Sequence, residues 1–157
     1  EQNLTATKTE KKQLEDKVDV ASTLHASYIG ITAIKVSNSG KEKETGTAKR
    51  ANLIRISFSL DENRVTPSGT KDIYVIVTGP DGKTITEGGT FVTREEGSKS
   101  FTSKVSVNYE QGKATPVSFD WKQKDTYKEG SYTIEIYNNG FKIGQGVKTL
   151  KKGGLFS

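Results

Sequence analysis

The spacing of apolar residues changes near Tyr28. Before that residue, apolar side chains recur every three or four positions in a charged background. This spacing predicts a helix with one apolar stripe. After it, apolar and polar residues alternate, as in residues 54–60. Alternation predicts strands with one buried face. The pattern therefore predicts a helical segment over residues 1–27 and a β-domain over residues 28–157.

The helical segment contains a heptad-like seam that is weak. Lys11 and His25 interrupt it, whereas tight coiled coils keep both core positions apolar. Three interpretations stay open: a coiled coil that continues upstream, packing on the domain's own sheet, or a frayed tail. The candidate oligomerisation seam consists of Leu4, Leu14, Val18 and Ala21. The second interpretation also uses Leu24.

The β-domain contains eight segments with strand character, and no helical pattern separates them. Short strands at regular spacing predict an antiparallel β-sandwich, so the fold class is mainly β. Residues 138–140, Asn-Asn-Gly, predict a tight hairpin, and Gly144 and Gly146 indicate a bulge or close packing. The predicted strands are residues 28–36, 52–60, 73–77, 83–86, 101–109, 117–122, 132–136 and 141–147.

The segment Trp-Lys-Gln-Lys-Asp-Thr-Tyr-Lys-Glu-Gly-Ser-Tyr-Thr-Ile, residues 121–134, resembles the late strand pair of bacterial Ig-like and fibronectin-III-like modules of cell-envelope proteins. The resemblance implies an antiparallel Ig-like β-sandwich of about seven to eight strands. It also implies that Tyr132 bonds nearby backbone through its hydroxyl, as in a tyrosine corner. Ile134 stands where true Ig domains have their second Cys. Such modules generally have no active site.

Composition narrows the possible chemistry. The net charge of +5 arises in the β-region and its C-terminal lysines. Lys and Glu are interspersed in residues 41–44, so the dense basic stripe typical of nucleic-acid binding is missing. The chain has no Cys and one histidine, His25, so the usual zinc ligand sets are missing. Residues 79–84 resemble a phosphate loop, but the spacing of their glycines is wrong. We therefore predict no catalytic, cofactor-binding or metal-binding residues.

These features predict a non-enzymatic interaction or structural module of the bacterial cell envelope, in the periplasm or at the surface. The helix would act as a spacer or oligomerisation stalk, with a protein partner or a second copy. Because the sequence contains no Met, we expect a longer parent chain with an upstream signal or anchor. The alternative is a carbohydrate-binding module. Its binding surface would be a row of exposed tyrosines: Tyr74, Tyr127 and Tyr137.

Overall fold

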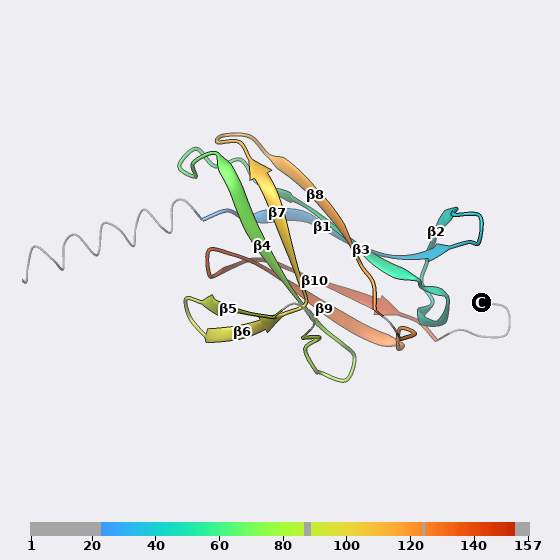
Figure 1. Cartoon of the computed structure of the whole chain (residues 1–157). Coiled ribbons are helices and arrows are strands. Elements are labelled where there is room, and N and C mark those ends of the chain that lie inside the picture. The colour runs from blue at the N-terminus through green and yellow to red at the C-terminus, as the bar shows by residue number, and fades with distance from the viewer. Residues whose placement is uncertain (1–22, 87–88, 124, 153–157) are drawn as a thin grey trace, which may run out of the picture.

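A computed structural model describes residues 23–86, 89–123 and 125–152 (Figure 1). Apart from one short 3-10 helix, η1 (Ala48–Arg50), the elements of these residues are β-strands. The strands are β1 (Ala26–Val36), β2 (Glu42–Thr45), β3 (Leu53–Leu60), β4 (Gly69–Thr78), β5 (Gly89–Thr93), β6 (Gly97–Phe101), β7 (Ser103–Tyr109), β8 (Thr115–Trp121), β9 (Gly130–Asn138) and β10 (Phe141–Leu150). The chain is therefore mainly β, as predicted.

Eight of these strands form two antiparallel sheets that pack face to face. One sheet has the order β2-β1-β3-β8 and the other β10-β9-β4-β7. The remaining pair, β5 and β6, forms a separate hairpin, which Figure 1 shows beside the second sheet. The predicted sandwich is thus present, with β2, β5 and β6 as strands that the alternation did not reveal.

A shared core between the sheets follows from the alternation of apolar residues. Ile54, Ile56 and Leu60 of β3 are completely buried, and so are Ile73 and Ile134 of the facing sheet. Each buried aliphatic side chain stabilises the fold by about 1.5–3 kcal/mol relative to exposure. Two half-buried sheet faces can only be stable together, so this core defines the domain.

The predicted helix needs correction at its C-terminal end. Its seam positions lie outside the described residues. Residues 23–25 are not helical, and β1 begins at Ala26 rather than at Tyr28. The loop after β3 is hydrogen-bonded to residues 23–25: the Asp61 N–H donates to the His25 carbonyl at 2.8 Å. Leu24 is completely buried in the sandwich core, so this residue belongs to the β-domain.

Two strand predictions were also wrong. Residues 83–86 make only one bridge, between Thr84 and Thr78, and no strand. The expected strand 101–109 is interrupted at Thr102, which is buried. The Thr102 hydroxyl donates to the Ile85 carbonyl at 2.6 Å and accepts from the Val77 N–H at 2.9 Å. A buried backbone group needs a partner, so Thr102 supplies one where the ladder stops.

The expectations for the last hairpin were confirmed. Asn139 and Gly140 have φ angles of 53° and 80°, the positive values of a primed turn. The register of β10 shifts between Lys142 and Gly144, which marks a bulge. The Tyr132 hydroxyl donates to the Lys128 carbonyl at 2.6 Å, the local backbone contact that the resemblance implied.

Gly144 and Gly146 let β1 of the first sheet pass close to β10 of the second. A Cβ atom added at Gly144 would lie 2.9 Å from the Cδ1 atom of Ile29. A Cβ atom at Gly146 would lie 2.9 Å from the Cδ1 atom of Ile31. Cβ atoms do not normally approach other atoms this closely, so a larger residue at either position would force the isoleucine side chains to shift.

Replacement of Gly146 by Val should therefore destabilise the domain. Overpacking at such a site costs about 1–3 kcal/mol, and urea denaturation should show a lower midpoint. Gly46→Ala is a matched control, because a Cβ atom there meets nothing within 4 Å. Equal midpoints for the two variants would contradict the crossing.

Tyr132→Phe should cost about 0.5–1.5 kcal/mol of unfolding free energy, because it removes the hydroxyl that bonds the Lys128 carbonyl. Thermal denaturation followed by circular dichroism measures this change. Tyr28→Phe serves as the control, since the Tyr28 side chain is almost fully exposed. A Tyr132→Phe variant as stable as its control would show that this bond is not stabilising.

Candidate interaction surfaces

The structure brings two of the three predicted tyrosines together and separates the third. Tyr74 and Tyr137 pair directly across β4 and β9. Tyr127 lies in the sandwich core, with 4% of its surface exposed. Its ring meets Trp121 edge to face with centroids 5.3 Å apart, and its hydroxyl donates to the Trp121 carbonyl at 2.8 Å. The prediction that Tyr127 lies off the core face was wrong. The residues around Tyr127 are charged and show no alternation, so the sequence did not indicate its contact with Trp121.

Tyr137 lies on the outer face of β9, away from the sandwich core, but the β5–β6 hairpin covers it. Only 3% of its surface is exposed, and the Phe91 ring packs edge to face against it at 5.3 Å. Burial raises the pKa of Tyr137, with a further contribution from the Glu135 carboxylate, which accepts the Tyr137 hydroxyl at 3.1 Å. The Tyr137 ring is therefore part of a second, smaller core.

Tyr74 is half-buried on the outer face of β4. Its ring stacks on Phe91 with centroids 4.6 Å apart and an interplanar angle of 3°. The Lys104 ammonium lies 5.7 Å from the same ring centroid, a cation–π distance. Phe91 therefore covers one face of the Tyr74 ring. Tyr74 and Tyr137 are neighbours, but Tyr127 lies in the sandwich core, so the three do not form an exposed row.

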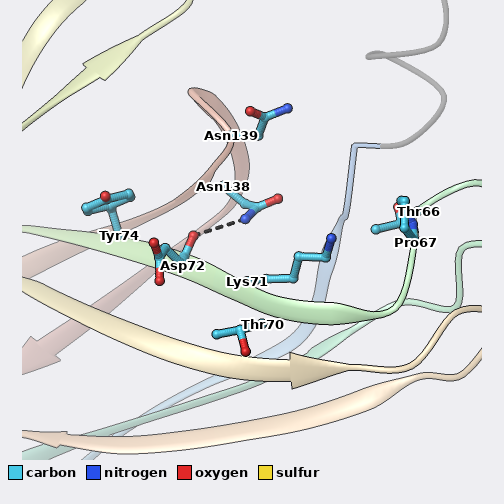
Figure 2. Close-up of a pocket in the computed structure, with 8 residues that line it drawn as sticks. All are labelled: Thr66, Pro67, Thr70, Lys71, Asp72, Tyr74, Asn138 and Asn139. Carbon is cyan, nitrogen blue, oxygen red and sulfur yellow. Dashed lines mark hydrogen bonds between the residues drawn. The ribbon is translucent and has the colours of Figure 1, made fainter.

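A polar hollow of about 470 Å³ lies beside Tyr74 where β9 ends (Figure 2). The Asn138 side-chain amide there donates to the Asp72 carbonyl at 3.0 Å. A second hollow of about 510 Å³ shares Tyr74 and Asn139 with the first and borders Phe91 and Arg94. We call the two together the outer groove. The first is lined by Thr66, Pro67, Thr70, Lys71, Asp72, Tyr74, Asn138 and Asn139.

Several polar groups of the outer groove are engaged with other groups of the protein. The Asp72 carboxylate accepts the Ser106 hydroxyl at 3.1 Å and lies 3.7 Å from the Lys104 ammonium. The Arg94 guanidinium donates to the Asn139 carbonyl at 3.0 Å. Within residues 23–86, 89–123 and 125–152, no three His, Cys, Asp or Glu side chains are placed to hold a metal ion. These contacts fix the polar side chains that border the groove.

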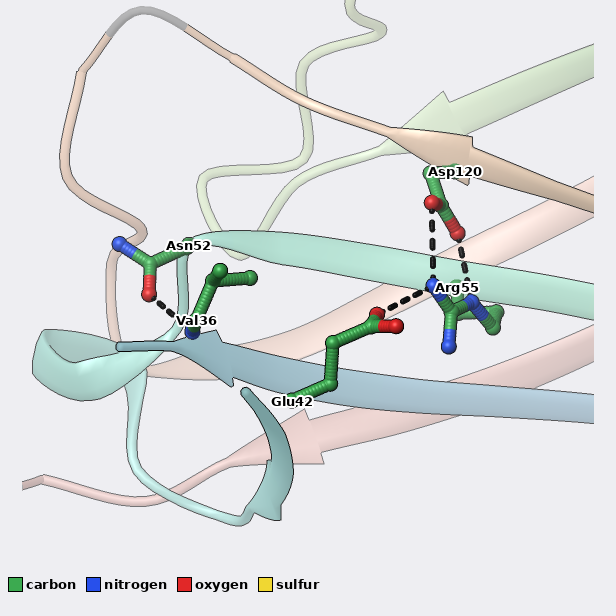
Figure 3. A network of polar contacts seen from close by, with 5 residues as sticks. All are labelled: Val36, Glu42, Asn52, Arg55 and Asp120. Carbon is green, nitrogen blue, oxygen red and sulfur yellow. Dashed lines mark hydrogen bonds and ion pairs between the residues drawn. The ribbon is translucent and has the colours of Figure 1, made fainter. Parts of the chain in front are cut away.

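An ion-pair network crosses the outer face of the first sheet (Figure 3). The Arg55 guanidinium donates to both Asp120 carboxylate oxygens, at 2.7 and 3.2 Å, and to the Glu42 carboxylate at 2.5 Å. These hydrogen bonds hold the pKa of Asp120 below its usual value and raise the pKa of Arg55. Because all three side chains are partly exposed, the network links β2, β3 and β8 with a small gain in stability.

Tyr28 is an exposed aromatic residue that the sequence analysis did not select as a site. All six tyrosines lie in the described residues, and Tyr28 is the exposed one, at 90%. Its φ angle is 55°, which costs a non-glycine residue about 1–2 kcal/mol. The sequence contained a signal for this exposure. Ala26, Ile29 and Ile31 all face inward, and the three-residue step from Ala26 to Ile29 departs from the period of two of a regular strand.

No helix within the described ranges is long and apolar enough to cross a membrane. A search of curated proteins gives no match. Among solved structures, the chain is similar to the β-D-glucoside glucohydrolase of Trichoderma reesei, with 10% identity, a TM-score of 0.51, and coverage of 83% of this chain and 19% of that chain. The GH3 β-glucosidase of Bifidobacterium adolescentis gives 14% identity, a TM-score of 0.45, and coverage of 82% and 17%.

The chain thus spans less than a fifth of the length of these two enzymes. At such low identity the similarity concerns the fold alone. A family model, described as a domain of unknown function, matches residues 27–151. This range begins in β1 and ends just after β10, so it covers the whole sandwich. The chain therefore belongs to the DUF8428 family of domains.

Proposed function

We propose that this chain is a non-enzymatic, Ig-like interaction module of a bacterial cell-envelope protein, with residues 1–22 as its spacer or oligomerisation segment. The observation that carries the proposal is the junction at residues 23–25. Leu24 is completely buried, and the Asn63 amide donates to the Thr23 carbonyl at 3.2 Å. Because these contacts hold residues 23 and 24 on the sandwich, the preceding segment is attached to the domain at a defined point.

The strand order supports the Ig-like assignment. β1, β3 and β8 neighbour each other as strands A, B and E do in Ig-like sandwiches. β4, β9 and β10 correspond likewise to strands C, F and G. Tyr132 lies near the start of β9, the position of the tyrosine corner at the start of strand F. On this assignment the β5–β6 hairpin is an insertion after strand C.

The envelope location rests on the resemblance of residues 121–134 to bacterial surface modules. The binding mechanism would be surface complementarity at the outer groove, which is bounded by the hairpin and by the loop before β4.

The carbohydrate-binding alternative loses its original basis. Stacking on a sugar requires an accessible ring face. Tyr127 and Tyr137 are buried, and Phe91 covers one face of Tyr74. We therefore do not propose a glycan site at this set of tyrosines.

The stalk function can be tested by comparing the full chain with a chain that starts at Thr23. Light scattering should show an oligomer for the full chain and a monomer for the shorter one. Truncation must spare Leu24, because it is a core residue, and an unchanged melting temperature shows that the sandwich is intact. In the full chain, Leu14→Lys should also dissociate the oligomer, because a charge at a core position destabilises helix association.

Lys12→Glu is the matched control, because Lys12 lies off the predicted seam. It should leave the mass unchanged. Equal masses for the full chain and the chain from Thr23 would contradict the oligomerisation segment.

A further inference from the structure

We infer that Tyr28 anchors an extended, neutral β-1,4-linked polysaccharide on the outer face of β1, β3 and β8. This site is separate from the outer groove. It does not depend on residues 1–22 as a spacer. The inference begins with the way in which β1 presents Tyr28 to solvent.

A bulge in β1 turns Tyr28 outward. Ser27 pairs with Ser59 and Gly30 with Ser57, so Tyr28 and Ile29 together lie opposite the single residue Phe58. This is the two-to-one count of a β-bulge. Ile29 faces the core side, where it packs against Gly144. The bulge thus keeps Ile29 inside and leaves the Tyr28 side chain without packing.

The Tyr28 ring is accessible on both faces, because 90% of its surface is exposed. An aromatic ring offers an apolar face for the C–H groups of a sugar ring, and its hydroxyl can bond sugar oxygens. The backbone on either side of Tyr28 is fixed by pairing with β3, so the ring is presented from a rigid element. Tyrosine is one of the residues that most often anchor binding surfaces.

The sheet face next to Tyr28 suits an extended polyol. Gly30 pairs with Ser57, and Ser57 pairs with Ser118, so these three residues form a row across the strands. A Cβ atom at Gly30 would lie 2.8 Å from the Ser57 hydroxyl oxygen, which places that hydroxyl over Gly30 on the same face. Strands lie about 4.8 Å apart, close to the length of one sugar unit in an extended β-1,4-linked chain.

Charge also favours a neutral ligand. The row contains no charged side chain, and hydroxyls donate as well as accept hydrogen bonds, as sugar hydroxyls do. The nearby Asp61 carboxylate accepts the Ser27 hydroxyl at 2.9 Å. On the same face, Arg55 is paired with Asp120 and Glu42. An anionic polymer would meet no unpaired cation in this row, whereas a neutral glycan matches its hydrogen-bonding groups.

The inference can be tested by titrating the ¹⁵N-labelled full chain with cellohexaose and, separately, with chitohexaose. Saturable amide shifts are expected at Ser57, Ser59 and Ser118 with at least one of the two. The two sugars distinguish a plain glucose chain from an N-acetylated one. The absence of shifts with both would overturn the inference, and so would shifts confined to Tyr74 and Asn139.

Variants at Tyr28 separate binding from folding. Tyr28→Gly should weaken binding about tenfold or more, as expected for loss of an aromatic anchor, while the melting temperature stays equal or rises because glycine tolerates a positive φ. Tyr28→Phe should retain most of the affinity through stacking. Val92→Ala, at another exposed apolar residue, should have no effect. Wild-type affinity in Tyr28→Gly would overturn the inference.

Discussion

The close crossing of β1 over β10 determines much of this sandwich. Ile29 and Ile31 reach the second sheet at the positions where Gly144 and Gly146 leave room for them. Since Ile29 must face inward while Ala26 also contacts the core side, one extra residue has to be accommodated between them. The bulge at Tyr28 accommodates it. A packing requirement at one edge of the domain therefore leaves one residue of β1 exposed on the opposite face of the same strand.

The β5–β6 hairpin has a comparable effect on the second sheet. β4 is apolar on both faces, and an outer face that carries Ile76 and Tyr74 needs a cover. Phe91 and Phe101 of the hairpin supply it. The hairpin thereby removes Tyr137 from solvent and borders the outer groove. Two of the three tyrosines that the sequence suggested as a binding row, Tyr74 and Tyr137, are thus part of this second, smaller core. The outer groove beside it is open to solvent.

The sequence predicted the parts of the fold that depend on local alternation. β3, β8 and β9 follow the period of two, and the Asn-Asn-Gly turn and the close packing at Gly144 were both recognisable. It could not predict β5 and β6, which contain few apolar residues, or the break at Thr102, which depends on a contact with Ile85. The helix was extended too far because Leu24 also fits a 3.6-residue period, although its burial depends on strands far away in the chain.

Packing explains why a bulge occurs in β1, but it does not explain why its outward residue is a tyrosine. A glycine or an asparagine would adopt the same φ angle with less strain, and an exposed side chain contributes no burial energy. Val65, Val92 and Val147 are also exposed, but they are small apolar residues of the kind that occur singly on most protein surfaces. Tyr28 differs because it combines the largest exposure among these residues with an unfavourable backbone geometry. Its identity is therefore better explained by a ligand than by the fold, and the neutral hydroxyl row beside it indicates which chemistry that ligand has.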